Sequence, residues 1–227
     1  MLSPYVPNYD AELEALATEK RVPVVGPYTV LQPDGSYGDD DEESTENRFT
    51  FYLLAGLELQ AEALVQAAAA NVQPANTHLA IVYPRVQFFD RLSAAAAVAA
   101  ERLGFASADE HVFELGQFSG QSAVLELREK QTGAVLFLGS GAELAQFARA
   151  ADSAGYAPLL LAPGLLAERN IFDVPASFDR KVLLAYASLP MDYSPEGAAE
   201  FEKLHEKYGF SYDYSIAQVN AYSAAKV

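Results

Sequence analysis

The feature that most constrains the fold of this chain is a regular alternation of short apolar runs with longer amphipathic segments. The predicted strands are 79–83, 111–115, 134–138, 158–162 and 181–187, and the predicted helices between them are 88–103, 120–131, 142–154 and 165–169. A short, continuous apolar run between turn signals is typical of a strand that is buried on both faces. The alternation therefore predicts an α/β fold: a Rossmann-like open parallel sheet with helices on both faces and right-handed crossovers.

The two ends of the chain do not continue this alternation. Before it, the sequence predicts a helix over 9–19, a short strand over 22–25, a loop over 32–47, a second strand over 49–54 and a helix over 57–70. The loop carries an uninterrupted acidic run from Asp39 to Glu43 without the ligand spacing of an EF-hand, so we expect a solvated loop and no calcium site. After Pro190 two helices are predicted, over 195–208 and 216–227.

Composition excludes several classes of protein. The chain has 227 residues and a formal net charge of −16, which argues against binding to nucleic acid or to anionic membrane surfaces. It contains no cysteine, so disulfides, thiol catalysis and thiolate metal sites are excluded. No apolar run approaches the ~20 residues that cross a bilayer, and the first residues lack the pattern of a signal peptide.

The turn at Gly139, Ser140 and Gly141 is the strongest local signal for a site. It ends the strand 134–138 and begins a helix, an arrangement that directs backbone N–H groups at a small anion. Gly139, Gly141 and Leu144 have the spacing of a dinucleotide fingerprint, but Leu144 replaces its third glycine and the acidic residue that contacts ribose is missing. Three interpretations stay open: an ordinary tight turn, a loop that binds a small ligand, and a nucleotide site.

Signals for catalysis are weak. His78 and His111 are expected just before strands and His205 on an acidic helix, all three as ordinary surface residues. No metal-ligand spacing is present, and Ser140 lacks both the nucleophile-elbow pattern and a base. We therefore expect no catalytic residue, no metal and no cofactor.

Ligands of open α/β sheets bind at the carboxyl ends of the strands, so the candidate binding residues follow the predicted strands. These segments are 28–30, 84–89, 116–119, 140–142 and 162–165. Their residues are mostly small, aromatic or amide-bearing, which is typical of a binding pocket.

The serial order of these segments resembles a known family. The residues that carry the resemblance are 22–27, 51–56 with Gln60, 79–83, Gly139 with 147–151 and Gly155, and 158–160. Together they resemble type I periplasmic binding proteins, and within them the branched-chain amino acid (Leu/Ile/Val) receptors of ABC transporters. The resemblance begins near Leu13 and continues to the end of the chain.

The resemblance implies two α/β lobes that clamp a ligand between them. It assigns 49–190 to a nearly complete second lobe with a crossover at each end, and 1–48 and 191–227 to incomplete pieces of the first lobe. The chain is therefore expected to be a fragment of a longer receptor.

The resemblance also implies ligand-binding residues. Tyr28, Thr29 and Val30 lie where the family holds the ligand carboxylate, with the hydroxyl of Thr29 as a donor; Phe88 corresponds to an aromatic over the ligand; Ser140 and Gly141 belong to another pocket loop; and Pro163 lies near the position of the acidic residue that binds the ammonium group of an amino acid. This departure at Pro163 favours an apolar or aromatic carboxylate as much as a simple amino acid.

We accordingly expect a periplasmic or extracellular, non-enzymatic receptor for an amino acid or another small carboxylate, with an ABC transporter permease as its partner. Two alternatives are a sensor module of a larger signalling or redox protein and a Rossmann-type nucleotide-dependent enzyme. The incomplete first lobe is expected to expose apolar faces and a lone strand at 22–25, so we also predict a homodimer formed through these segments.

Overall fold

The computed structural model describes residues 10–27, 49–187, 194–211 and 215–226. The chain divides into two compact units, one made of Glu58–Tyr186 and the other of Met1–Leu57 with Ala187–Val227. The segments predicted as the acidic loop and as the carboxylate-binding residues Tyr28, Thr29 and Val30 lie outside the described residues.

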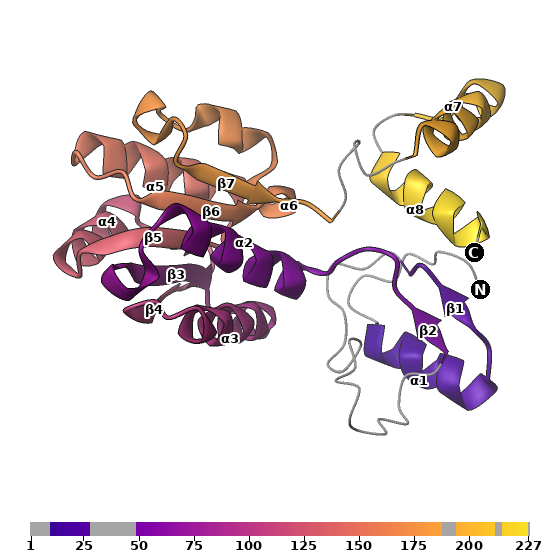
Figure 1. Cartoon of the computed structure of the whole chain (residues 1–227), viewed down its shortest axis with the longest axis horizontal. Coiled ribbons are helices and arrows are strands. Elements are labelled where there is room, and N and C mark those ends of the chain that lie inside the picture. The colour runs from indigo at the N-terminus through magenta and orange to yellow at the C-terminus, as the bar shows by residue number, and fades with distance from the viewer. Residues whose placement is uncertain (1–9, 28–48, 188–193, 212–214, 227) are drawn as a thin grey trace. The chain divides into compact units, whose positions relative to one another are not determined.

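The larger unit is built on one five-stranded sheet (Figure 1). Its strands are β3 (His78–Pro84), β4 (Ser107–Phe113), β5 (Thr132–Phe137), β6 (Leu159–Pro163) and β7 (Val182–Ala185). They lie in the order β4-β3-β5-β6-β7, and every neighbouring pair is parallel. The predicted open parallel sheet is confirmed.

Helices cover both faces of this sheet (Figure 1). They are α2 (Leu57–Asn71), α3 (Gln87–Arg102), α4 (Gly120–Glu129), α5 (Gly141–Ser153) and α6 (Gly164–Ala167), with short 3-10 helices at Pro74–Asn76 (η1), Glu168–Asp173 (η2) and Ala176–Phe178 (η3). On one face, side chains such as Val82 and Phe137 form one core with Leu127 of α4 and Phe147 of α5.

The opposite face of the sheet is buried as well. Leu79 and Ile81 of β3 and Leu136 of β5 alternate with the residues of the first core and are fully buried. Burial on both faces explains why these strands are continuous apolar runs. An ion pair of 2.8 Å between Arg91 of α3 and Glu58 of α2 joins two helices of this unit.

Strand β4 begins at Ser107, four positions before the predicted start at His111. Strand β4 is an edge strand, and its first half is mostly polar. The pattern of apolar runs therefore does not predict where the strand begins. Ser107 donates to Asp109 Oδ2 at 2.7 Å and pairs with His78 Nδ1 at 2.9 Å. His111, predicted at the amino end of this strand, instead lies well inside β4, and its Nδ1 is 2.8 Å from Glu126 Oε2.

The smaller unit contains α1 (Asp10–Lys20) and two short parallel strands, β1 (Val24–Val25) and β2 (Thr50–Phe51). Leu13 and Ala17 of α1 pack with Val24 of β1 in a small core that Phe49 borders. The expectation of a lone strand at 22–25 is therefore wrong, because β2 supplies its partner.

Two helices, α7 (Pro195–Tyr208) and α8 (Ser215–Lys226), complete the smaller unit. Lys226 and Glu200 form an ion pair of 2.7 Å between them. His205 is only 3% exposed, and its Nε2 is 3.0 Å from Gln218 Oε1 of α8. The prediction of a surface histidine is wrong here, because the burial of His205 depends on a second helix that the local pattern does not reveal.

Candidate functional site

The topology marks one place at the carboxyl edge of the sheet. Strand β4 pairs with one side of β3, and β5, the next strand along the chain, pairs with the other side of β3. The helices that follow β3 and β5 consequently lie on opposite faces of the sheet, which is the switch point where ligands of open α/β folds bind. The four described candidates, Phe88, Ser140, Gly141 and Pro163, all follow or end β3, β5 and β6, which are neighbours in the sheet.

The connection after β5 is a closely packed turn. A side chain at Gly139 would place its Cβ 2.8 Å from the ring of Phe137 and 2.9 Å from Glu143. At Gly141 the Cβ would lie 2.2 Å from the carbonyl oxygen of Ala167. Both positions need glycine because neighbouring atoms approach the backbone, so packing alone accounts for this turn without a nucleotide.

Ser140 begins α5 in a capping box with Glu143. The carboxylate oxygen Oε2 of Glu143 accepts from both the backbone N–H and the hydroxyl of Ser140, each at 2.8 Å. Glu143 N in turn donates to Ser140 Oγ at 3.4 Å. The predicted anion site is thus already occupied by a carboxylate of the protein, and a ligand anion there would have to displace Glu143.

The other two candidates are apolar. Phe88 lies in the first turn of α3, is half-buried, and packs edge-to-face on Phe89 with ring centroids 4.7 Å apart. Pro163 ends β6 beside Ala185 of β7 and is buried. Gly164, which follows it, would carry a Cβ only 2.1 Å from the ring of Tyr186.

Large apolar side chains are exposed along the same carboxyl edge. Val86 follows β3, Leu115 follows β4, Leu165 lies just after β6 and Tyr186 follows β7 directly, with exposed fractions of 38%, 69%, 48% and 45%. We call these four residues the apolar rim. Leu115 and Tyr186 were missed by the sequence interpretation, although an apolar residue placed directly at a strand end was the available signal.

The charges near the switch point are paired. Arg85 Nε donates to Glu114 Oε1 at 2.8 Å, which joins the connections after β3 and β4. The backbone N–H of Arg85 also donates to Phe113 O at 2.7 Å. Arg85 and Glu114 therefore engage each other beside the exposed side chains of the apolar rim.

A polar network supports the end of β3 from the face that α3 covers. Ser93 donates to Glu110 Oε1 at 2.6 Å. Burial raises the pKa of the nearby Tyr83 phenol, and its hydrogen bond to Glu110 raises that pKa further. Tyr83 is therefore neutral at physiological pH, and its hydroxyl donates a hydrogen bond at the carboxyl end of β3.

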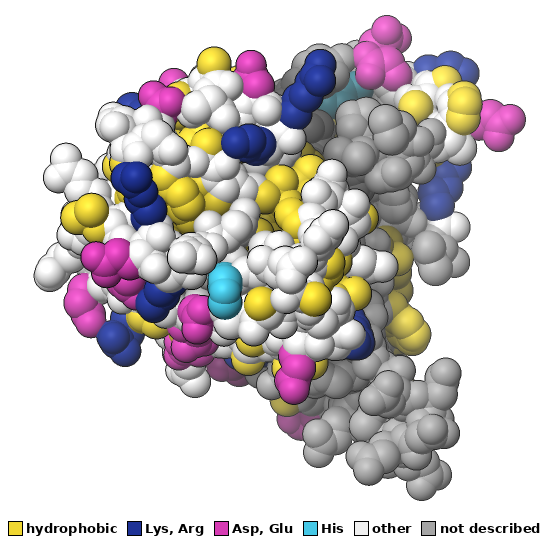
Figure 2. All heavy atoms as spheres, turned by 60° about the vertical axis from the view of Figure 1, so that its left-hand side comes forward, with side chains coloured by type: hydrophobic (Ala, Val, Ile, Leu, Met, Phe, Trp, Pro, Cys, Tyr) yellow, Lys and Arg dark blue, Asp and Glu magenta, His cyan; other side chains and the backbone are white. Residues whose placement is uncertain are grey.

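The described residues contain no candidate metal centre. Within residues 10–27, 49–187, 194–211 and 215–226, no group of three or more His, Asp or Glu side chains is placed to hold a metal ion. None of the helices in those ranges has the length and apolar character that a bilayer crossing needs. Figure 2 shows acidic and basic side chains interspersed on one face of the larger unit, without a basic stripe.

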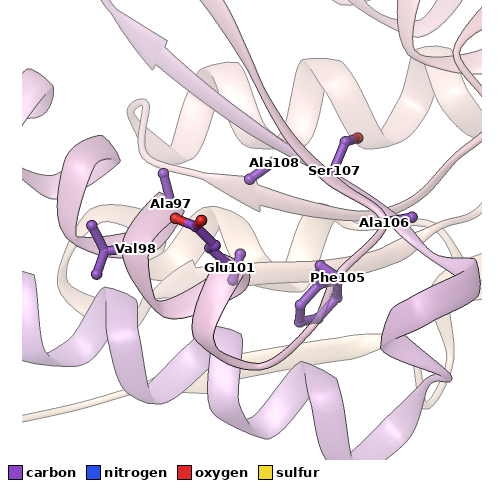
Figure 3. A pocket seen from close by; sticks show the side chains of 8 residues that line it. Ala97, Val98, Glu101, Phe105, Ala106, Ser107 and Ala108 are labelled. Atoms are coloured by element: carbon purple, nitrogen blue, oxygen red, sulfur yellow. The ribbon is translucent and has the colours of Figure 1, made fainter.

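A cavity of about 380 Å³ lies at the amino end of β4, where α3 ends (Figure 3). Because the strands are parallel, this is the edge opposite the switch point. The cavity therefore does not coincide with the candidate ligand site.

We compared the sequence and the fold of this chain with those of known proteins. The fold is an α/β lobe with one topological switch point. The sequence profile described as "Periplasmic binding protein" matches residues 8–227, so the chain belongs to the periplasmic binding protein family. No curated protein sequence matched significantly.

Solved structures of this family share the fold at low sequence identity. A leucine-binding protein from Thermotoga maritima is 18% identical with a TM-score of 0.65, and the match covers 96% of this chain and 59% of that one. A branched-chain amino acid ABC transporter protein from Thermus thermophilus with bound valine is 17% identical, TM-score 0.68, covering 98% and 57%. A solute-binding protein from R. palustris in complex with benzoate is 13% identical, TM-score 0.61, covering 94% and 56%. The chain thus spans less than two thirds of the length of each.

Proposed function

We propose that this chain is the ligand-binding part of a solute-binding protein that delivers a small carboxylate, an amino acid or another, to an ABC transporter permease in the periplasm or outside the cell. It binds and releases this ligand without chemical conversion. The observation that carries the proposal is the convergence of Phe88, Ser140 and Pro163 on three neighbouring strand ends at the switch point. In this proposal, the lobe predicted at 49–190 presents these residues from its compact body, Glu58–Tyr186.

The chemistry of the edge supports a ligand with an apolar body. The apolar rim exposes hydrocarbon where ligands of such folds bind, Arg85 is paired with Glu114, and the Glu143 carboxylate accepts hydrogen bonds from Ser140. Leucine, valine and benzoate, which are named with the similar structures, all combine a carboxylate with an apolar group. Because Glu143 occupies the start of α5, we assign the ligand carboxylate to the predicted group of Tyr28, Thr29 and Val30.

A nucleotide-dependent enzyme is not favoured by the same turn. Leu144 stands at the third glycine position of the fingerprint and is fully buried in the core. The Glu143 carboxylate sits at the helix start, where a pyrophosphate would need free N–H donors. Phosphate binding would therefore bring like charges together.

A thermal-shift experiment tests the proposal. L-leucine, L-valine, benzoate and hexanoate are each added at a concentration of about ten times a millimolar Kd, with NAD and ATP as comparison ligands. Binding at that level stabilises the folded protein by about 1.4 kcal/mol, which raises the Tm of a domain of this size by about 3–6 °C.

We expect such a shift with at least one of the four carboxylates, and we expect Phe88→Ala to abolish it. The matched control is Leu125→Ala, which removes another exposed apolar side chain, on α4 and away from the strand ends; it should leave the shift intact. Stabilisation by NAD or ATP alone, or by none of the six compounds, would overturn the proposal.

We also propose that the chain forms a homodimer through the smaller unit. Leu16, Val22, Phe51, Tyr208 and Phe210 of that unit are between 42% and 58% exposed, although β1 is paired and a small core exists. Apolar side chains in such number favour an apolar partner, and a second copy presents the same surface.

A further inference from the structure

The cavity at the amino end of β4 has the features of a second binding site. It lies between the last turns of α3 and the segment that leads into β4. It is lined by Ala97, Val98, Ala100, Glu101, Phe105, Ala106, Ser107 and Ala108. Its volume of about 380 Å³ falls within the range of small-molecule sites.

The lining of the cavity combines apolar side chains with polar atoms. Ala97 and Ala100 leave space beside the edge strand because a methyl group is all that they present. Phe105 is 9% exposed, and its backbone N–H donates to Ala100 O at 3.0 Å, which ties the backbone of Phe105 to the end of α3. Figure 3 shows this ring on the segment that faces the Ala97, Val98 and Glu101 side chains of α3.

The charge of the cavity is negative. Glu101 is the charged residue in its lining, and it lies in the last turn of α3, where the helix dipole also favours a cation. The neighbouring Arg102 does not cancel this charge inside the cavity, because its guanidinium is 3.7 Å from Glu62 of α2.

The remaining polar side chain of the lining is already engaged. Ser107 donates its hydroxyl to Asp109 and is also hydrogen-bonded to His78. A ligand in the cavity therefore meets apolar side chains beside polar atoms and one carboxylate, and the Ser107 hydroxyl is already engaged.

From this combination we infer that the cavity binds a small organic cation with an apolar body, such as an aryl-alkyl ammonium ion, at a site separate from the carboxylate site of the proposed function. The apolar body fills the space between Ala97 and Phe105, and the ammonium group lies against Glu101. Since Glu101 is exposed, its contribution to selectivity is modest.

Ligand-observed NMR titration with two isosteric probes tests the inference. The probes are phenethylammonium and neutral 2-phenylethanol, at low ionic strength. We expect phenethylammonium to bind about three- to five-fold more tightly than 2-phenylethanol, the range that one exposed ion pair supports. Half-molar salt should remove this preference.

Three variants locate the site. Glu101→Gln should equalise the cation and the alcohol, and Ala106→Leu, at an exposed position of the lining, should weaken both. Glu129→Gln, on the exposed surface of α4, is the matched control and should change neither. Circular dichroism melting of each variant establishes that it is folded.

An unchanged cation preference in Glu101→Gln, an unchanged affinity in Ala106→Leu, or no binding of phenethylammonium at 20-fold excess over a millimolar Kd would overturn the inference. The carboxylate thermal shifts of the proposed function are independent of all three results, because that site lies at the opposite edge of the sheet.

Discussion

The side-chain amide of Asn220 donates to the carbonyl oxygen of Gly26 at 2.7 Å, which joins two residues 194 positions apart in the sequence. Both residues are buried, and a side chain at Gly26 would place its Cβ 3.0 Å from Cβ of Ala224. Helix α8 therefore packs directly against the end of β1. This contact joins the N-terminal and C-terminal segments of the smaller unit.

Replacing Asn220 by alanine should loosen the smaller unit. The substitution leaves the buried carbonyl of Gly26 without its donor, which costs about 1–3 kcal/mol. Hydrogen exchange should become faster in α8 and β1 while the larger unit keeps its protection. Asn71→Ala is the control, because Asn71 is exposed and bonds only within its own helix, to Ala67 O at 2.8 Å. Equal exchange rates in both variants would contradict the role assigned to Asn220.

Gly141→Ala should destabilise the larger unit by about 1–3 kcal/mol, the usual cost of overpacking. The new methyl group would lie 2.2 Å from a backbone carbonyl of Ala167, which cannot swing aside as a side chain can. Gly133→Ala is a suitable control, because its Cβ would meet only the side chain of Thr77, at 3.0 Å. Urea denaturation measures both. A smaller loss of unfolding free energy in Gly141→Ala than in Gly133→Ala would show that α6 does not pack tightly against this turn.

The strands of the larger unit show which parts of the fold the sequence could predict and which it could not. The buried strands β3, β5 and β6 were predictable because burial on both faces makes them continuous apolar runs. The start of β4 was not, because residues Ser107–Glu110 lie on an edge strand and are mostly polar.

Features that depend on distant residues escaped the sequence interpretation. The burial of His205 requires Gln218 on another helix, and the partner of Gly26 lies near the opposite end of the chain. The glycine turn and Phe88 were recognised as candidate site residues, whereas Leu115 looked like part of a strand. The parallel strands bring the members of the apolar rim to one edge, and the order of the strands decides which of them are neighbours.

The pH dependence of stability should include a contribution from Glu126. A hydrogen bond from Lys130, followed by the nearby His111, lowers the pKa of the Glu126 carboxyl. A lowered pKa in the folded state stabilises the protein above the unfolded value of about 4.3, and this stability is lost as the pH falls through the folded-state pKa.

Because this carboxylate is 42% exposed, the effect should stay below about 1 kcal/mol. Glu126→Gln should reduce the free energy of unfolding at pH 7 and flatten its decline below pH 5, whereas Glu129→Gln should do neither. A decline of unchanged steepness in Glu126→Gln would remove Glu126 from this account.

Self-association is expected to depend on the smaller unit. Light scattering at micromolar concentration should give the mass of a dimer, and the double substitution Leu16→Glu with Phe51→Glu should shift it to a monomer by placing charges on the exposed apolar surface. The matched double substitution Val98→Glu with Leu125→Glu, on exposed positions of the larger unit, should leave the dimer intact. A monomeric unsubstituted chain would rule out the proposed homodimer.

The central claim, that the switch point of the parallel sheet holds the carboxylate ligand, is tested most directly by backbone amide NMR during titration with benzoate and L-valine. We predict that the largest chemical-shift changes occur at the carboxyl edge of the larger unit, in Val86, Phe88, Ser140, Gly141 and Gly164. Changes that concentrate instead at the amino ends of the strands, or that are absent at ligand concentrations which raise the Tm, would contradict it.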